Sequence, residues 1–491
     1  MDRFGRSVCP SPSQCSPARP TGRVRPAVTD EQTNASLEKM RAEGAADAAV
    51  ATFAHYHELL RSGDEGVLRE SDLEPVESLP DADELPDDEQ GARDALARAV
   101  VIKLNGGLGT SMGMTAPKSL LPVKDGLSFL DITVRQILHL REATGAGLPL
   151  VLMNSFATRE QSLAALARYD DLPVDGVAAD FVQSKVPKLT ADELEPVYWP
   201  ADRALEWAPP GHGDLYPSLL SSGMLDTLLH AGYEYAFVAN ADNLGAVLEP
   251  RILAWFAREQ IPFAMEVADR TPADRKGGHV AQHRDGGGLV LREVAQTLDE
   301  DRDAFQDITR HRFFNTNTLW VHLPSLASVL EQRGGVLGLP MIVNRKTVDP
   351  TDSSSPRVIQ LETAMGAAID AFDGARAIRI PKSRFAPVKT TDDLLALRSD
   401  AFVLLDDGRI TLAPERDGPP PLIALDERYF KLLDDVDERF AHGPPSLVEA
   451  EQLKVRGDVH FGAGIVIRGA VEIEHSGEEP LQLADGTVLD G

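Results

Sequence analysis

Short apolar runs alternate with helical patterns along most of the chain from about residue 98 onward. The run AVVIKL at 99–104 predicts a buried strand, and the segment 128–140 repeats apolar residues along one helix face: Leu130, Val134, Ile137 and Leu138. A second helix is expected at 158–169, where Thr158 and Gln161 have the spacing of a capping box. Further strands are predicted at 149–155, 181–184, 233–240, 262–269, 313–323 and 375–380. This alternation is typical of an α/β domain with a mainly parallel sheet.

The N-terminal part of the chain has a different texture. Residues 1–35 are poor in large apolar side chains, and we expect them to form a disordered tail. A helical stretch at 36–62 follows, and then the acidic stretch 71–90, which we interpret as a solvated connector. Together these form an N-terminal helical and acidic segment at 36–95.

The C-terminal part repeats apolar pairs every six residues. The repeating positions are Leu453, Val459, Ile465 and Val471, and, two residues further on, Val455, Phe461, Ile467 and Ile473. Such a period favours a few coils of a parallel β-helix, although a pair of antiparallel hairpins is an alternative. We therefore expect a catalytic domain at 96–405 and a β-helix domain at 406–491. So few coils would pack on the large domain or on another subunit.

Charge and composition exclude several classes of function. The formal net charge of −28 over 491 residues opposes non-specific binding to nucleic acid or to an anionic membrane. The sequence has no apolar run long enough to span a membrane and no signal-peptide core, so we expect a cytoplasmic protein. Cys9 and Cys15 both lie in the tail, which argues against a disulfide framework and against thiol catalysis.

A glycine-rich loop follows the first predicted strand of the large domain. The stretch KLNGGLGTSMGMTAPKSLLPV at 103–123 lacks the spacings of a P-loop and of a dinucleotide-binding fingerprint. Its glycines would let backbone N–H groups converge on an anion. Lys118 lies eleven residues after Gly107 and directly follows Pro117, so it could neutralise a polyphosphate held by the loop. A tight turn with a purely structural role is the alternative.

Many motifs together make the chain similar to a known enzyme family. KLNGGLGTSMG with PKSLLPV, LMNSFATREQ, FVQSKVPKL, EWAPPGHGDLYPSL, VANADNLGA, FFNTNTLWVHL and SRFAPVKTTDDLL resemble the UTP:glucose-1-phosphate uridylyltransferases of the eukaryotic-type UDPGP family, in the same order. The resemblance covers about residues 90–405. It implies a large Rossmann-like, glycosyltransferase-A-like nucleotidyltransferase domain with a mixed, mainly parallel sheet, followed by a small left-handed parallel β-helix.

The resemblance also implies an activity. Members of the family make UDP-glucose and pyrophosphate reversibly from UTP and glucose 1-phosphate, with Mg²⁺, by in-line attack of the sugar phosphate on the α-phosphorus. Oligomers through the C-terminal β-helix are possible. One alternative is a pyrophosphorylase for UDP-N-acetylhexosamine or for several UDP-sugars. A catalytically silent nucleotide-sugar sensor is a second.

Matching motif by motif assigns site residues. The catalytic pair is Lys118 and Lys389. The implied nucleotide-binding residues are Leu104, Asn105, Gly106, Gly107, Lys118, Gln183, Gly211, Asp242 and Lys389. The implied sugar-phosphate residues are Gly107, His212, Asn240, Ala241, Asp242, Asn315 and Glu362. Asp242 is the candidate Mg²⁺ ligand, because Mg²⁺ prefers one or two carboxylates together with phosphate oxygens. For Glu362 an ion pair within the fold is an alternative role.

A few positions depart from the family pattern or carry a local prediction. Thr318 stands where the family has an asparagine, and Arg270 stands where it often has a lysine. Neither change removes an implied phosphate ligand. Thr391 is the predicted N-cap of the helix that follows Lys389.

Overall fold

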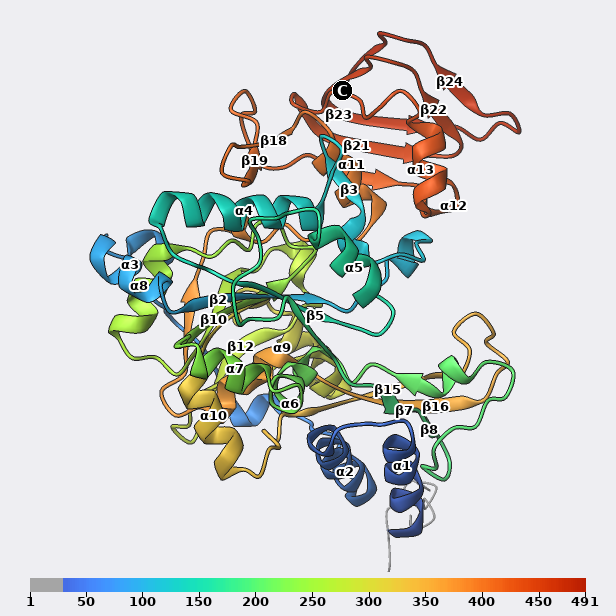
Figure 1. Ribbon diagram of the computed structural model, residues 1–491. Helices are drawn as coiled ribbons and strands as arrows, with labels where there is room; N and C mark the ends of the chain where they lie inside the picture. The colour runs from blue at the N-terminus through green and yellow to red at the C-terminus, as the bar shows by residue number, and fades with distance from the viewer. Residues whose placement is uncertain (1–29) are drawn as a thin grey trace, which may run out of the picture.

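The computed structural model describes residues 30–491. An α/β body lies in the middle, with helices α1 (Asp30–Ala42) and α2 (Asp47–Ser62) at one end and the C-terminal strands at the other (Figure 1). Residues 30–35 of the expected disordered tail therefore belong to α1. The rest of that tail, with Cys9 and Cys15, lies outside the described residues.

The central sheet has ten strands. Its main path runs β1-β12-β14-β10-β2-β5-β6, while β13 pairs with β12, and β11 pairs with both β14 and β17. The strands β6, β5, β2 and β10 are mutually parallel, and β14 is antiparallel to β10. The strand bounds are β1 Leu73–Pro75, β2 Ala99–Asn105, β5 Leu150–Asn154, β6 Asp180–Val182, β10 Tyr235–Asn240, β11 Phe263–Asp269, β12 His279–His283, β13 Leu289–Arg292, β14 Phe313–His322 and β17 Arg376–Arg379. The sheet is thus mixed, with a parallel half.

Helices cover both faces of this sheet and bury a core on each. One face carries α6 (Leu215–Ser221), α7 (Met224–His230) and α10 (Leu323–Gln332). The other carries α3 (Glu89–Leu96), α4 (Phe129–Thr144), α5 (Arg159–Leu166) and α8 (Pro250–Arg258). This three-layer arrangement confirms the predicted α/β class. Among the described residues, no helix is both long and apolar enough to cross a membrane.

The predicted strands of the large domain are all present, but the capping box predicted at the start of α5 is absent. Leu130, Val134 and Ile137 on α4 are buried as the periodicity required. In α5, by contrast, Thr158 lies before the helix without capping it through its side chain. The Thr158 hydroxyl accepts instead from the Ser155 N–H at 2.9 Å, so the predicted capping box does not form.

The acidic stretch 71–90 is more than a solvated connector. Leu73 is fully buried, and β1 adds a strand to the edge of the central sheet by pairing with β12. Asp81 forms an ion pair with Arg379, and Asp88 caps α3 by accepting from the Gly91 N–H. Acidic composition could not reveal the added strand or the ion pair, because β12 and Arg379 lie far away in the sequence.

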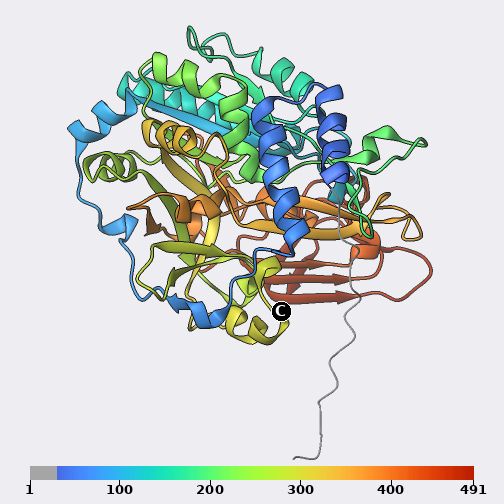
Figure 2. The same cartoon turned by 90° about the horizontal axis from the view of Figure 1, so that it is seen from below.

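The N-terminal helices cover a small second sheet. Helices α1 and α2 lie side by side (Figure 2) and pack on the sheet β15-β16-β8, formed by Met341–Thr347, Arg357–Thr363 and Leu189–Thr190. Phe53 and Leu60 of α2 join Ile359 and Leu361 of β16 in one apolar cluster. This end of the molecule also carries the antiparallel pair of β7 (Val186–Pro187) and β9 (Trp207–Ala208).

The C-terminal strands pair in parallel, which favours the β-helix over antiparallel hairpins. One sheet has the order β20-β21-β23-β25 (Leu422–Leu425, Ala450–Arg456, Val466–Glu474, Val488–Asp490), and β22 (Val459–Phe461) pairs with β24 (Leu481–Leu483). All eight residues of the six-residue repeat are buried in one cluster. Helices α12 (Glu427–Phe430) and α13 (Leu433–Arg439) cover one flank, and α11 (Thr391–Arg398) joins this domain to the body.

The repeat predicts which side chains of this domain contribute most to its stability. Ile467 is fully buried, so Ile467→Ala should lower the free energy of unfolding by about 2 to 5 kcal/mol through lost transfer energy and a residual cavity. Val488 lies on the edge strand β25 and is 46% exposed, so Val488→Ala should change it by less than about 0.5 kcal/mol. Urea unfolding followed by circular dichroism measures both. Equal effects of the two substitutions would contradict the coil arrangement.

Candidate active site

The candidate site lies where the parallel strands end. Strands β2 and β10 pair in register, so that Asn240 lies opposite Leu104. Just beyond, the Ala241 N–H donates to the Leu104 carbonyl at 3.1 Å. This hydrogen bond connects the NADN segment, residues 240–243, to the start of the glycine loop. Ligands of open α/β sheets bind at this carboxyl edge.

The glycine loop folds back on itself and returns Lys118 to this edge. Leu108 and Pro117 form an isolated antiparallel bridge, and the Lys118 N–H donates to the Gly107 carbonyl at 3.1 Å. A Cβ added at Gly107 would meet no atom within 4 Å, so the backbone there faces open space. The geometry therefore agrees with a loop that exposes its backbone to a ligand.

Lys118 joins three segments that are distant in sequence. Its Nζ lies 2.7 Å from the Asp242 carboxylate and also donates to the Val388 carbonyl. Val388 directly precedes Lys389, whose side chain is exposed. The structure thus brings together Lys118, the candidate metal ligand Asp242 and the backbone next to Lys389.

An apolar cluster explains this meeting. Met112 of the glycine loop, Leu244 after the NADN segment and Val388 pack in one cluster with Leu394 of α11. The cap of α11 differs from the prediction: Thr390 forms a capping box with Asp393, while the Thr391 hydroxyl donates to the Phe430 carbonyl at 2.6 Å. Thr391 instead connects α11 to the C-terminal domain.

Gln183, one of the implied nucleotide-binding residues, lies against the glycine loop. A Cβ added at Gly106 would lie 2.9 Å from both terminal atoms of the Gln183 amide, so a larger residue here would displace the amide from its present position. Gln183 directly follows β6, and its N–H donates to the Asn154 carbonyl at 2.7 Å. The Asn105 side chain turns away, donating to Asn154 Oδ1 at 2.7 Å and Ser162 Oγ at 2.8 Å. Asn105 can therefore meet a ligand only through its backbone.

The loop after Pro210 supplies a neutral histidine. Gly211 has φ = 79°, and a Cβ there would lie 2.5 Å from the Thr363 carbonyl oxygen, so both conformation and space require glycine. The Met365 N–H donates to His212 Nδ1 at 2.9 Å, and burial lowers the pKa of His212 to about 4. With Nδ1 accepting, the proton of the neutral ring resides on Nε2, which can donate to an anionic oxygen.

The sugar-phosphate candidates Asn315 and Glu362 lie near the loop that carries Gly211 and His212. Asn315 is buried, and its amide exchanges two 2.8 Å hydrogen bonds with Asn317, which has φ = 55°. Gly366, next to Met365, is closely packed: a Cβ there would lie 2.9 Å from Met265 Cε and 3.2 Å from Asn315 Nδ2. Glu362 contacts Gly211 and lies 3.9 Å from Lys346 Nζ. That separation makes the alternative ion pair a long one.

The other sequence candidates have simpler positions. Asn240 is half-buried at the end of β10, and Ala241 is buried. Thr318, which replaces the family asparagine, is fully buried with no hydrogen-bond partner for its hydroxyl among the described residues. Arg270 donates to four backbone carbonyls, those of Phe305, His311, Asp274 and Arg275. Its role here is thus to hold the 271–275 turn.

Two carboxyl groups near the site escaped the sequence analysis. Asp214 is buried and accepts from the Ser184 N–H at 2.6 Å and the Ser218 hydroxyl at 2.7 Å, so it links the Gln183 segment to the His212 loop. Burial raises the pKa of Glu293, which hydrogen-bonds Asn315, to about 7. The GHGD motif contained Asp214 but gave no signal of its burial, and Glu293 lies in no motif.

The donor set around Asp242 suits a metal that arrives with a nucleotide. No group of three or more His, Cys, Asp or Glu side chains that could hold a metal exists among residues 30–491. One partly exposed carboxylate beside the glycine loop fits Mg²⁺, which takes its other ligands from phosphates and water.

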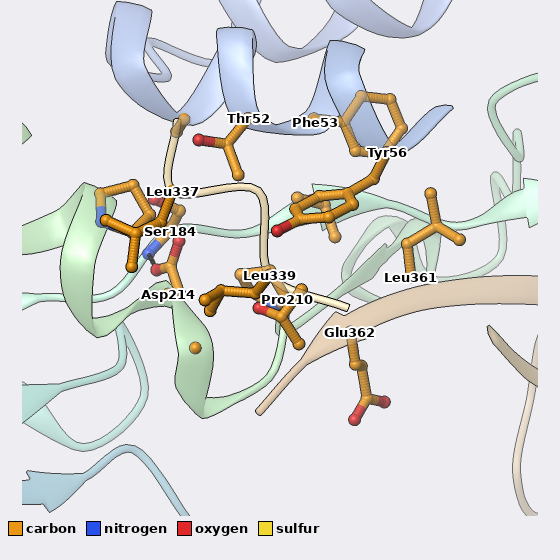
Figure 3. A pocket seen from close by; sticks show the side chains of 15 residues that line it. Thr52, Phe53, Tyr56, Ser184, Pro210, Asp214, Leu337, Leu339, Leu361 and Glu362 are labelled. Atoms are coloured by element: carbon orange, nitrogen blue, oxygen red, sulfur yellow. Dashed lines mark hydrogen bonds between the residues drawn. The ribbon is translucent and has the colours of Figure 1, made fainter. Parts of the chain in front are cut away.

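A small pocket, lined on one side by α2, lies behind the His212 loop (Figure 3). Thr52 and Tyr56 of α2 point into it, Asp214 lies on its opposite side, and the Glu362 carboxylate points away from α2. Lys118, Asp242 and Lys389 do not line it. This pocket separates α2 from the back of the site loop, distinct from the phosphate end.

The buried carboxyl of Asp214 predicts a pH-dependent stability. Burial raises the pKa of Asp214 to about 6 from an ordinary value of 3.8, so the folded state holds the proton more tightly than the unfolded state. Its stabilising contribution is then largest in acid and is lost as the pH rises through about 6. Relative to Asp214→Asn, the free energy of unfolding of the wild type should fall on the order of 1 kcal/mol between about pH 5.5 and about pH 7.5. Denaturant titrations across this range measure the difference, and a constant difference would contradict the assignment.

Comparison with known proteins agrees with this site. The family model described as UTP--glucose-1-phosphate uridylyltransferase matches residues 51–468. The chain is 40% identical to the UTP--glucose-1-phosphate uridylyltransferase of Solanum tuberosum over 82% of this chain and 83% of that protein. It is 41% identical to the enzyme of the same name in Saccharomyces cerevisiae, over 80% of this chain and 77% of that protein.

Solved structures give the same result. A variant of the UDP-glucose pyrophosphorylase of Leishmania major in complex with UDP-glucose superposes with a TM-score of 0.87 at 44% identity, covering 94% of this chain and 98% of that one. A Trypanosoma brucei UDP-glucose phosphorylase superposes with a TM-score of 0.86 at 46% identity, covering 94% of this chain and 98% of that one. On this evidence the chain belongs to the UTP--glucose-1-phosphate uridylyltransferase family.

Proposed function

We propose that this chain is a UTP--glucose-1-phosphate uridylyltransferase, which makes UDP-glucose and pyrophosphate from UTP and glucose 1-phosphate. The observation that carries the proposal is the meeting of Lys118, Asp242 and the Lys389 segment at the glycine loop. Family membership and the ligand-bound Leishmania major relative support the choice of substrates.

The reaction exchanges one phosphoanhydride bond for another. A phosphate oxygen of glucose 1-phosphate forms a bond to the α-phosphorus of UTP, and the bond from that phosphorus to the bridging oxygen of the β-phosphate breaks. Pyrophosphate leaves with the bonding electron pair. The attacking oxygen is already ionised, so the protein must mainly hold the reactants in line and stabilise the phosphate charge.

The nucleotide would lie along the glycine loop. The backbone of Leu104 to Gly107 approaches the nucleoside and phosphates, and the Gln183 amide supplies a donor and an acceptor for the uracil edge. Gly211 would also contact the base. Lys118 pairs with the triphosphate and Lys389 with the reacting phosphates, each as a compact positive charge.

The sugar phosphate would lie between the His212 loop and the end of β10. His212 Nε2–H donates to a phosphate oxygen without adding a charge, since its pKa is far below neutrality. Glu362, Asn240 and Asn315 offer polar atoms to the sugar hydroxyls, and Gly107 and Ala241 border the same space.

Mg²⁺ is part of the proposal. Asp242 would hold the ion together with phosphate oxygens, and the bound ion would supply charge neutralisation at the phosphates. The protein residues then have the task of orienting the two substrates. We further propose that the enzyme works in the cytoplasm and that copies can associate through the C-terminal β-helix.

The activity has a direct test. Purified protein with UTP and Mg²⁺ should release pyrophosphate when glucose 1-phosphate is added, and a chelator should abolish this release until Mg²⁺ is restored. A panel of sugar 1-phosphates determines selectivity. A preference for N-acetylglucosamine 1-phosphate would support the alternative pyrophosphorylase, and no release with any sugar would support the silent sensor.

The role of Lys389 predicts a separation of kinetic constants. Lys389→Ala should lower kcat by about 100-fold or more while the KM for UTP changes by less than about 3-fold, because the lysine acts mainly on the transition state. Lys431, an exposed lysine of the C-terminal domain, provides the control, and Lys431→Ala should leave both constants unchanged. Steady-state kinetics measure both variants. A Lys389→Ala enzyme with wild-type kcat would remove this residue from the mechanism.

A further inference from the structure

Lys389 lies on a segment with little regular structure. The segment 381–390 connects β17 to α11 and contains one short 3-10 turn, Lys382–Arg384. The Lys389 side chain is exposed, and its Nζ lies 5.9 Å from the centre of the Phe385 ring. The placement of this lysine must therefore come from the contacts that hold its segment.

The strongest of these contacts is a forked ion pair beneath the segment. Arg384 Nη2 lies 2.9 Å and 3.1 Å from the two carboxylate oxygens of Glu266, and Arg384 Nε lies 3.2 Å from Glu266 Oε2. The Glu266 side chain is fully buried, and that of Arg384 is 14% exposed. A planar guanidinium can bond both oxygens of one carboxylate, whereas an ammonium is a point charge.

Glu266 is itself fixed in the central sheet. It lies on β11, next to β14, and its Oε1 accepts from Trp320 Nε1 at 3.0 Å. Arg384 Nη2 also donates to the Val247 carbonyl at 2.8 Å. The pair therefore connects the Lys389 segment to the central sheet.

Next to this ion pair, the Lys389 segment packs against the loop that follows Asp242. A Cβ added at Gly245 would lie 2.7 Å from the Ser383 carbonyl oxygen, so the two backbones are in close contact. The Ala386 N–H donates to Asn243 Oδ1 at 3.0 Å, and Asn243 and Pro387 form a β-bridge. The backbone is therefore held in place from Arg384 to Val388, whose carbonyl accepts from Lys118 Nζ.

We propose that Arg384 is a positioning residue for the transfer reaction: its two-point contact with Glu266 holds segment 384–389 against residues 243–245 and so sets where the Lys389 ammonium meets the reacting phosphates. This inference rests on the proposed role of Lys389. Displacement of a catalytic group by about 1 Å can cost about 100-fold in rate, so the anchor matters for turnover as well as for folding.

Arg384→Lys provides the test, because it keeps the positive charge but cannot bond both carboxylate oxygens of Glu266 as the guanidinium does. We expect kcat to fall by about 10- to 100-fold, with the KM for UTP within about 3-fold of the wild type. Arg379→Lys is the matched control. Two nitrogens of Arg379 also bond a β11 carboxylate, Nε at 2.9 Å and Nη2 at 2.6 Å, both to Asp269 Oδ2. Arg379 precedes the segment, so the variant should keep its kcat.

A double-mutant cycle with Lys389→Ala distinguishes positioning from general destabilisation. If Arg384 acts through Lys389, Arg384→Lys should change kcat by less than about 2-fold in the Lys389→Ala background. Rates are measured with labelled glucose 1-phosphate and divided by the folded fraction from thermal unfolding. Wild-type kcat in Arg384→Lys, or an equal loss in both backgrounds, would overturn the proposal.

A second variant covers the case in which Arg384→Lys does not fold. Glu266→Gln keeps an acceptor for Trp320 and removes the charge that holds the guanidinium, so it should show the same background-dependent loss of kcat. An equal loss in both backgrounds would overturn the proposal here too. If Lys389→Ala alone keeps its turnover, the proposed role of Lys389 fails, and that result is separate from the behaviour of Arg384.

Discussion

The parallel, in-register pairing of β2 with β10 is the constraint on which the rest of the site depends. Since both strands end at the same edge, the glycine loop and the NADN segment begin side by side, and the contact from Ala241 N–H to the Leu104 carbonyl holds them together. Lys118 can reach Asp242 only because the loop returns to that edge. The Lys389 segment then joins them through the Val388 carbonyl.

Charge organises this site locally, against the field of the whole protein. A chain of net charge −28 repels free polyanions over long distances, so phosphate binding needs concentrated donors at short range. The glycine loop offers backbone, Lys118 and Lys389 offer ammonium groups, and His212 offers a neutral N–H. The buried pair of Arg384 and Glu266 serves a different purpose, since its charges are satisfied by each other and fix geometry.

Local sequence was a reliable guide wherever neighbours in the chain decide the structure. The β-branched runs of the large domain form strands as predicted, and the six-residue period forms parallel coils. The same reasoning failed at Thr158, whose hydroxyl accepts from the Ser155 N–H before the helix. It failed also at Thr391, whose hydroxyl donates to the Phe430 carbonyl of the C-terminal domain. It failed also for the acidic stretch 71–90, because the partner strand β12 is about 200 residues away.

The sequence by itself determined the elements, the order of the motifs and the residue types that carry the chemistry, since periodicity and glycine spacing are local properties. Tertiary structure alone decided which of those residues meet: Gly106 admits the Gln183 amide, Asp214 braces the His212 loop, and Arg384 holds the Lys389 segment on the sheet. The contacts of Asp214 and Arg384 join residues 30 and 118 positions apart, and no local pattern of residues encodes such pairings.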